Sequence, residues 1–283
     1  MLNSSIPCVL LVEDNIVALH IVESLVTKAG YRFISAMDGE EALELAQSEA
    51  FDLIITDIGL PGMSGYDFTE KVRLWEAECE KKPIPIVGLT AHSTEQETNK
   101  CLEVGMNDLF PKPFTLNMMR VIENQFMVSS DKRSFDHFHD NKRLQDEKLA
   151  LDLDYIERQL IELQHLPLLD VSMAMEHLGS EEMLHAILSM MVNQEIPNDL
   201  LALETAFRVK NWDCVEKLAH KMKGGALYCG TIRMKYACQN FERYHQTGYA
   251  PLLEMLYHHL FQVAEDTKKS IEQWLLNASS SML

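Results

Sequence analysis

The chain has 283 residues, of which 47% are hydrophobic and 24% are charged, and its formal net charge is −18. This composition is typical of a globular protein of about two domains and is too apolar for a disordered chain. We expect neither nucleic acid nor an anionic membrane surface as a partner, because both would repel so acidic a chain. We also expect no direct membrane insertion, because no apolar run reaches the roughly 18 residues that span a bilayer.

The first residues and the cysteines point to a compartment. The segment MLNSSIPCVLLVEDN lacks a basic stretch, and its short apolar run ends in acidic residues, so it does not resemble a signal peptide. The six cysteines include no C-x-x-C pair, and we expect them to be free thiols in a reducing cytoplasm. A longer parent protein could still be anchored to a membrane.

The first part of the chain, residues 6–127, alternates two periodicities. Short apolar runs lie at 8–12, 33–36, 53–56, 84–89 and 108–110, and stretches of helical period lie at 16–29, 39–48, 67–78, 94–104 and 115–126. Five strands alternating with five helices predict an α/β fold, a doubly wound five-stranded parallel sheet with helices on both faces. In such a sheet, ligands bind beyond the carboxyl ends of the strands.

Polar residues follow four of these strands. Glu13 and Asp14 come after the first strand, and Asp57 comes after the third. Three carboxylates at one edge of a sheet repel one another unless a cation lies among them, and hard oxygen ligands suit Mg²⁺. Thr90 ends the fourth strand and Lys112 follows the fifth, and both side chains suit the oxygens of a phosphoryl group. An aspartate in this setting can act as a nucleophile and form an acyl phosphate.

The motifs VLLVEDN, IITDIGLPGMSG, GLTA and KPF occur in this order on the expected elements. With them, residues 6–127 resemble the receiver domain of two-component response regulators, whose fold is flavodoxin-like. The resemblance implies that Asp57 is the phosphoacceptor and becomes 4-aspartylphosphate. It also implies that Glu13, Asp14 and Asp57 bind Mg²⁺, with the carbonyl of Gly59 as a further ligand.

The same resemblance assigns the residues after the fourth and fifth strands. It implies that Thr90 and Lys112 contact the phosphoryl oxygens and that the Lys112–Pro113 peptide bond is cis, a geometry nearly confined to proline. Two other families fit less well. The loop with Gly59, Gly62 and Gly65 mimics a nucleotide-binding loop but lacks the Walker lysine. A haloacid-dehalogenase-type phosphatase would need a second aspartate where this chain has Gly59.

A linker is expected over residues 129–166, between a first domain at 1–128 and a second at 167–283. It begins with a polar stretch, and apolar residues then repeat at a spacing of four and three through Leu149, Leu153, Ile156, Leu160 and Leu163. This stripe predicts a charged amphipathic helix over about 144–165. Two heptads are too few to identify a coiled coil, so the helix either packs on its own domain or pairs two chains.

The second domain contains no strand signal. Helical stretches are predicted at 180–210, 212–229, 231–247 and 252–276, with an interruption near Pro197 and short connections between them. Short connections favour antiparallel neighbours, so the pattern predicts an all-α bundle.

One helix of this bundle has an unusual outer face. At about 100° per residue, its apolar side chains share one direction. They are Val215, Leu218, Ala219, Met222, Ala226 and Cys229. His220 points roughly 150° and Gly224 roughly 170° away from them, which predicts an exposed imidazole. Consecutive glycines inside a helix cost stability, so Gly224 and Gly225 indicate the close approach of a partner.

Basic residues gather around this histidine. Lys217 and Lys223 lie beside His220, and they would offset negative charge after a neutral imidazole attacked an acyl phosphate. Of the ten basic residues in the second domain, seven lie within 208–235, whereas residues 1–128 contain 9 basic and 20 acidic residues. We therefore expect the two domains to attract each other.

The segment AHKMKGGALYCG resembles the histidine-phosphotransfer (Hpt) domain, and the resemblance covers about 168–276. The family pattern is a histidine, then lysine at +3, glycine at +4, a small residue at +6 and glycine at +10, here His220, Lys223, Gly224, Ala226 and Gly230. The resemblance implies a four-helix bundle in which His220 becomes phosphohistidine. Lys223, Gly224 and Lys217 would support that histidine.

Together, the two resemblances imply phosphorelay signal transduction with Mg²⁺ as the cofactor. A phosphoryl group would pass from an upstream sensor histidine kinase to Asp57, then to His220, then to the receiver domain of a downstream response regulator. The layout resembles the C-terminal part of a hybrid sensor histidine kinase. No ATP-binding kinase motif is present, so whether the chain is itself an enzyme stays open. The alternative is a phosphorylation-switched interaction module whose helical domain only docks a partner.

Overall fold

The computed structural model describes residues 6–91, 94–127, 160, 163–247 and 252–281. The amphipathic helix expected over about 144–165 lies almost entirely outside these residues, so it stays a prediction, as do the domain boundaries. None of the helices in the described ranges is both long and apolar enough to cross a membrane.

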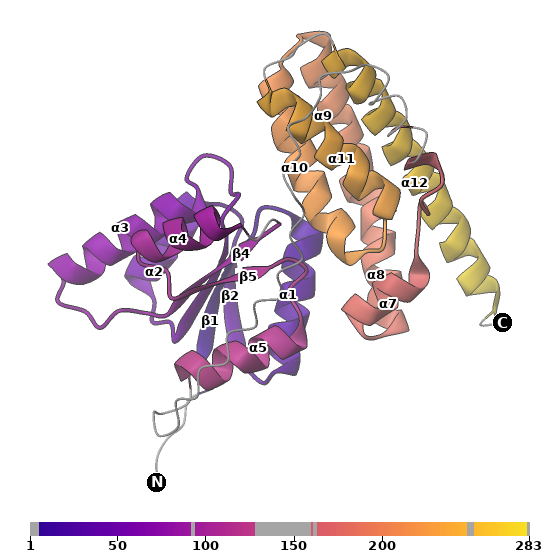
Figure 1. Cartoon of the computed structure of the whole chain (residues 1–283). Helices are drawn as coiled ribbons and strands as arrows, with labels where there is room; N and C mark the ends of the chain where they lie inside the picture. Colours follow the sequence, from indigo (N-terminus) through magenta and orange to yellow (C-terminus); the bar gives the residue numbers. More distant parts are fainter. Residues whose placement is uncertain (1–5, 92–93, 128–159, 161–162, 248–251, 282–283) are drawn as a thin grey trace.

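The first domain is the predicted parallel sheet between two layers of helices (Figure 1). The strands are β1 Cys8–Val12, β2 Arg32–Ala36, β3 Leu53–Asp57, β4 Ile86–Thr90 and β5 Asp108–Pro111, in the order β2-β1-β3-β4-β5. The helices are α1 Ile16–Lys28, α2 Gly39–Ser48, α3 Gly65–Glu78, α4 Glu95–Glu103 and α5 Leu116–Ile122, and a π-helical turn, Glu123–Met127, extends α5. The predicted doubly wound α/β fold is confirmed.

Alternation along β1 explains why its sequence is apolar throughout. Val9 and Leu11 pack into the apolar cluster that contains α1 and α5, and Leu10 and Val12 pack into the cluster on the opposite face. Successive side chains of a strand point to opposite faces, so a strand covered on both faces has no polar positions.

The predicted start of the fourth strand is wrong by two residues. Strand β4 begins at Ile86, because Pro83 and Pro85 supply no N–H groups for a sheet ladder. The carbonyl of Pro85 still accepts a hydrogen bond from the Ile54 N–H at 2.9 Å.

The parallel register aligns the polar strand ends at one edge. Val12 of β1 lies opposite Thr56 of β3, and Asp57 lies opposite Leu89 of β4. Residues that follow these positions therefore meet beyond the carboxyl ends of the strands, where ligands bind in such sheets.

The second domain is the predicted helical bundle. Its helices are α7 Val171–Leu178, α8 Glu181–Met190, α9 Ile196–Arg208, α10 Trp212–Tyr228, α11 Ile232–Gln246 and α12 Leu253–Ser281. The interruption predicted near Pro197 is a π-helical turn, Met191–Glu195, that joins α8 to α9. Proline is tolerated in the first turn of α9, where an N–H would lack a helical partner.

The two domains pack against each other through α1 and α10 (Figure 1). The apolar cluster on the α1 face of the sheet continues into the interior of the bundle. This packing brings the outer face of α10 to the carboxyl edge of the sheet, where the polar strand ends lie.

Candidate functional site

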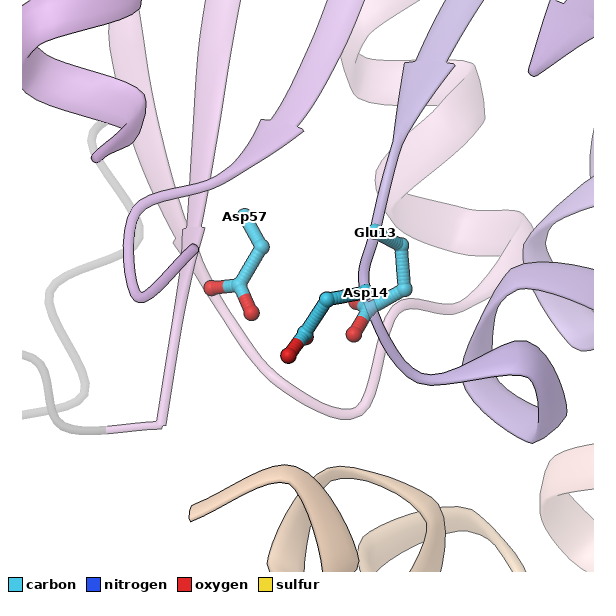
Figure 2. Close-up of side chains that lie close together, drawn as sticks. All are labelled: Glu13, Asp14 and Asp57. Carbon is cyan, nitrogen blue, oxygen red and sulfur yellow. The ribbon is translucent and has the colours of Figure 1, made fainter. Parts of the chain in front are cut away.

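Three carboxylates meet at the carboxyl edge of the sheet (Figure 2). Glu13 and Asp14 directly follow β1, and Asp57 is the last residue of β3. One carboxylate oxygen from each lies within 4.8 Å of the others. Glu13 and Asp57 are buried and Asp14 is half-buried. The strand ends therefore hold these oxygens at a spacing that suits one small cation.

Lys112 joins two of these carboxylates. It follows β5, and its Nζ donates hydrogen bonds to Glu13 Oε2 at 2.6 Å and to Asp57 Oδ2 at 2.8 Å. The Gly59 N–H donates to the other oxygen of Asp57 at 3.0 Å. The peptide bond between Lys112 and Pro113 is cis. A single ammonium group therefore offsets part of the negative charge of the three carboxylates.

Burial favours a higher pKa at all three carboxyl groups, but their neighbours make the net shifts differ. Burial raises the pKa of Glu13 to about 8, although the Lys112 ammonium opposes this shift. Burial also raises the pKa of Asp14, and the nearby Asp57 adds to the effect. At Asp57, burial would raise the pKa, but Lys112 and the Gly59 N–H hold it below its ordinary value. Asp57 is thus the carboxylate whose ionised form is favoured most, which suits a nucleophile.

The remaining predicted residues of the first domain border this cluster. Thr90 is the last residue of β4 and is buried, and its carbonyl accepts a hydrogen bond from the Lys112 N–H at 2.7 Å. A Cβ added at Gly65 would collide with the backbone oxygen of Asp57. The loop from Gly59 to Gly65 thus folds tightly against the end of β3. This close approach explains why position 65 is a glycine.

His220 reaches this edge from the other domain. It lies on α10, and a Cβ added at Gly59 would collide with its Nε2. Its side chain is 34% exposed. It lines a cavity of about 10 Å³ together with Asp14, Asp57 and Lys112, which leaves room for about one water molecule. The structure therefore places the imidazole directly beside the acidic site.

The prediction that His220 is an exposed imidazole with Lys217 and Lys223 beside it is partly wrong. Lys223 is 3% exposed and forms an ion pair with Glu242, whereas Lys217 is exposed. Gly224 is buried, and a Cβ there would contact Asn15 and Glu13 of the first domain. Helical periodicity correctly predicted which face of α10 points away from the bundle core. It did not predict that the first domain packs on this face and buries part of it.

Gly224 and Gly225 lie where another part of the protein approaches α10 closely, as the sequence predicted. A Cβ on Gly225 would lie 3.1 Å from Asn15 Oδ1 and 3.2 Å from Asn15 Nδ2, so the Asn15 side chain would have to shift by a few tenths of an ångström. The partner that approaches α10 is the first domain of the same chain. Asn15 also donates a hydrogen bond through Nδ2 to the Lys221 carbonyl at 2.7 Å.

Glu242 is a residue of the site to which the sequence reasoning assigned no role. Its Oε1 lies 2.8 Å from His220 Nδ1, and its other oxygen pairs with Lys223. This hydrogen bond raises the pKa of His220, although burial opposes the shift. Burial would raise the pKa of Glu242, but His220 and Lys223 hold it below its ordinary value. The signal was a single acid within the predicted helix 231–247, four residues after the apolar Cys238.

Replacing Glu242 with glutamine is expected to lower the pKa of His220, because it removes the carboxylate that stabilises the imidazolium. It also leaves the buried Lys223 without a counter-charge, so we expect the free energy of unfolding to fall by about 3–5 kcal/mol. NMR titration of the imidazole and chemical denaturation measure the two effects. Glu254→Gln is the control, because Glu254 pairs with Lys210 on the exposed surface.

The sign of the pH dependence follows from the raised pKa of His220. The imidazolium–Glu242 bond stabilises the folded state below the ordinary histidine value of 6.5 and is lost as the pH rises through the raised value. The difference in stability between the wild type and Glu242→Gln should therefore shrink from about pH 5 to about pH 8. A difference that grows over this range would contradict the assignment.

Comparisons with known proteins agree with this architecture. Residues 9–122 match the family model of the response regulator receiver domain, and residues 188–275 match that of the Hpt domain. A crystal structure of the receiver domain of a sensor histidine kinase from Pseudomonas aeruginosa PAO1, with a coordinated magnesium ion, is 33% identical in sequence. The match covers 42% of this chain and 97% of that chain, with a TM-score of 0.38.

Two longer relatives match both domains. Sensor histidine kinase GacS of Pseudomonas protegens is 27% identical over 241 residues, which cover 85% of this chain and 24% of that protein. Sensor protein GacS of Pseudomonas syringae pv. syringae is 30% identical over 244 residues, which cover 85% and 25%. The chain thus spans about a quarter of the length of these relatives. It belongs to the phosphorelay proteins of two-component signal transduction and consists of a response regulator receiver domain followed by an Hpt domain.

Proposed function

We propose that Asp57 accepts a phosphoryl group from a sensor histidine kinase, that His220 takes it over, and that His220 donates it to an aspartate of a downstream response regulator. The observation that carries the proposal is the packing of His220 against Gly59, two residues beyond Asp57. A nucleophilic imidazole and a nucleophilic carboxylate thereby line one cavity, although they belong to different domains.

The carboxylates of Glu13, Asp14 and Asp57 and the carbonyl of Gly59 are the proposed ligands of Mg²⁺. Hard oxygen donors at this spacing fit the ion, and Lys112 alone cannot offset three acidic side chains. Bound Mg²⁺ would supply positive charge for the oxygens of the transferred group. In the protein, Lys112 serves the same end, because its ammonium can turn from the Asp57 carboxylate to a phosphoryl oxygen beside it. Thr90 would donate its hydroxyl to another of these oxygens.

In the first transfer, an Asp57 oxygen attacks the phosphorus of the kinase phosphohistidine. A P–O bond forms, the P–N bond breaks, and the kinase imidazole leaves with the electron pair of that bond. The lowered pKa of Asp57 keeps the attacking oxygen ionised. In-line positioning and charge stabilisation are the main contributions that a protein makes to such a transfer.

In the second transfer, His220 Nε2 attacks the phosphorus, the P–O bond to Asp57 breaks, and the aspartate carboxylate is restored. Glu242 accepts a hydrogen bond from His220 Nδ1, so the proton of the neutral imidazole resides on Nδ1. The lone pair on Nε2 is then free to attack. The product imidazole carries positive charge, and the Glu242 carboxylate stabilises it. Glu242 is thus a positioning residue, and Lys223 holds it in place.

We further propose that the second transfer occurs within one chain, between a receiver domain at 1–128 and an Hpt domain at 167–283 joined by a linker at 129–166. The α1–α10 packing and the Asn15–Lys221 hydrogen bond support this proposal. We also propose that the relay works in the cytoplasm, which suits the six free cysteine thiols.

Asp57→Asn is expected to abolish all labelling by radiolabelled acetyl phosphate, because an amide is neither a nucleophile nor a good Mg²⁺ ligand. His220→Gln should retain label on Asp57 alone. The stability of the label identifies its site, because an acyl phosphate is lost in base and phosphohistidine is lost in acid. Label on His220 in the Asp57→Asn chain would refute the proposed route. Label confined to Asp57 in the wild type would favour the interaction module with an idle His220.

Excess EDTA is expected to block labelling of Asp57, and added Mg²⁺ should restore it, because the clustered carboxylates need the cation. Asp14→Asn should raise the Mg²⁺ concentration at half-saturation by about tenfold or more. Isothermal titration of the unphosphorylated chain with Mg²⁺ measures this binding without any transfer step. Labelling that continues at the normal rate in excess chelator would rule out the metal site.

Transfer within one chain predicts a rate that does not depend on protein concentration. A mixture of His220→Gln, which supplies Asp57, and Asp57→Asn, which supplies His220, must instead transfer between chains. We expect the mixture to be much slower than the wild type at about 1 μM, because a tether provides an effective concentration near the millimolar range. A mixture as fast as the wild type at that concentration would show that transfer occurs between chains.

A further inference from the structure

Within the part of the chain that the structure describes, helix α10 forms two hydrogen bonds with the receiver domain in addition to the packing of His220. The Lys221 carbonyl accepts the hydrogen bond from Asn15, as described above. Further along the helix, the Tyr228 hydroxyl accepts a hydrogen bond from the Phe114 N–H at 2.9 Å. The two contacts lie seven residues apart, about 10 Å along the helix axis. The second contact is the one that the proposed function leaves unexplained.

The Tyr228 side chain contacts both domains. The residue is 0% exposed and lies in the apolar cluster that fills the bundle, yet its hydroxyl contacts a backbone amide of the receiver domain. A phenylalanine would fill the same apolar space, so the packing of the bundle does not require the hydroxyl. Burial raises the pKa of Tyr228, so the group remains a neutral hydroxyl. Its hydrogen-bond partner among the described residues is the Phe114 N–H.

The position of Phe114 gives this contact its significance. Phe114 is the second residue after Lys112, whose ammonium bonds to Asp57 and Glu13. Its side chain is buried on the α1 face of the sheet, so the segment is held on one side by the receiver core. The Tyr228 hydroxyl holds the same segment from the Hpt side. One hydrogen bond therefore ties the loop that carries Lys112 to the helix that carries His220.

We propose that Tyr228 is a positioning residue for the transfer between Asp57 and His220. Its hydroxyl anchors residues 112–114 of the receiver domain to α10 and so fixes His220 Nε2 and the Lys112 ammonium relative to each other. The inference rests on the proposed function, because it assigns a role within that transfer. It is specific to the docked pair of domains and concerns neither the loading of Asp57 nor the folding of the bundle.

Tyr228→Phe in the full chain tests the inference, with acetyl phosphate and Mg²⁺ as the phosphodonor mixture. We expect the transfer from Asp57 to His220 to slow by roughly three- to tenfold, the range that one lost neutral hydrogen bond produces. The rate at which Asp57 is labelled should not change, which a His220→Gln background isolates. The Phe114 amide should exchange its hydrogen faster with solvent, because it loses its acceptor. Tyr236→Phe is the matched control, since that residue lies on α11 and is partly exposed.

The amide exchange separates this role from a general loss of packing. Faster exchange at Phe114 together with slower transfer and an unchanged thermal midpoint would support the inference. Transfer at the wild-type rate in Tyr228→Phe would overturn it, as would unchanged exchange at Phe114 or equal slowing in Tyr236→Phe. These outcomes leave the proposed function intact. A wild-type chain that places no label on His220 would overturn the proposed function and this inference together.

Discussion

The site depends on one constraint, which is that three carboxylates, two of them buried and one half-buried, lie at the same edge of a sheet. Burial, together with their mutual repulsion, raises the pKa values of Glu13 and Asp14, and only Asp57 has enough opposing contacts to keep its pKa below the ordinary value. Lys112 offsets part of this charge. A phosphoryl group would add negative charge to the same place, so cations and hydrogen-bond donors are required to stabilise the site both before and after phosphorylation.

The Hpt domain meets part of that need from outside the receiver domain. Among the groups that act on Asp14, both His220 and Lys221 favour the ionised carboxylate. Lys221 itself is held by Asp199 at 3.1 Å and by Glu195 at 3.4 Å. The basic residues gathered along α10 thus do more than attract an acidic surface at long range, because two of them act directly on the carboxylate cluster. Charge at the sheet edge and charge on α10 stabilise the docked arrangement together.

The sequence was sufficient for features that repeat locally and insufficient for those that depend on a distant partner. Apolar runs and helical periods predicted the strands, the bundle and the outer face of α10, since each of these patterns is set by neighbours along the chain. The strand ends supplied the carboxylate cluster. Glu242 and Tyr228 received no role, and the pairing of Lys223 with Glu242 was not predicted, because the partners of these three residues are 22, 114 and 19 residues away. No periodicity encodes such a pairing.

The docked arrangement also limits how the relay continues. Gly59 of the receiver domain abuts His220 Nε2, so no second receiver can reach this nitrogen until the first one leaves. In the proposed relay, a downstream regulator would bind only the undocked fraction, and its apparent affinity would be the intrinsic affinity multiplied by that fraction. Among the described residues, hydrogen bonds join the domains from Asn15 to the Lys221 carbonyl, from the Phe114 N–H to the Tyr228 hydroxyl, and from Lys28 to the Leu178 carbonyl. A neutral hydrogen bond contributes about 1 kcal/mol, so these bonds alone do not make docking irreversible. An interface that opens and forms again would allow both proposed steps, because the covalent connection between the two domains keeps their effective concentration high.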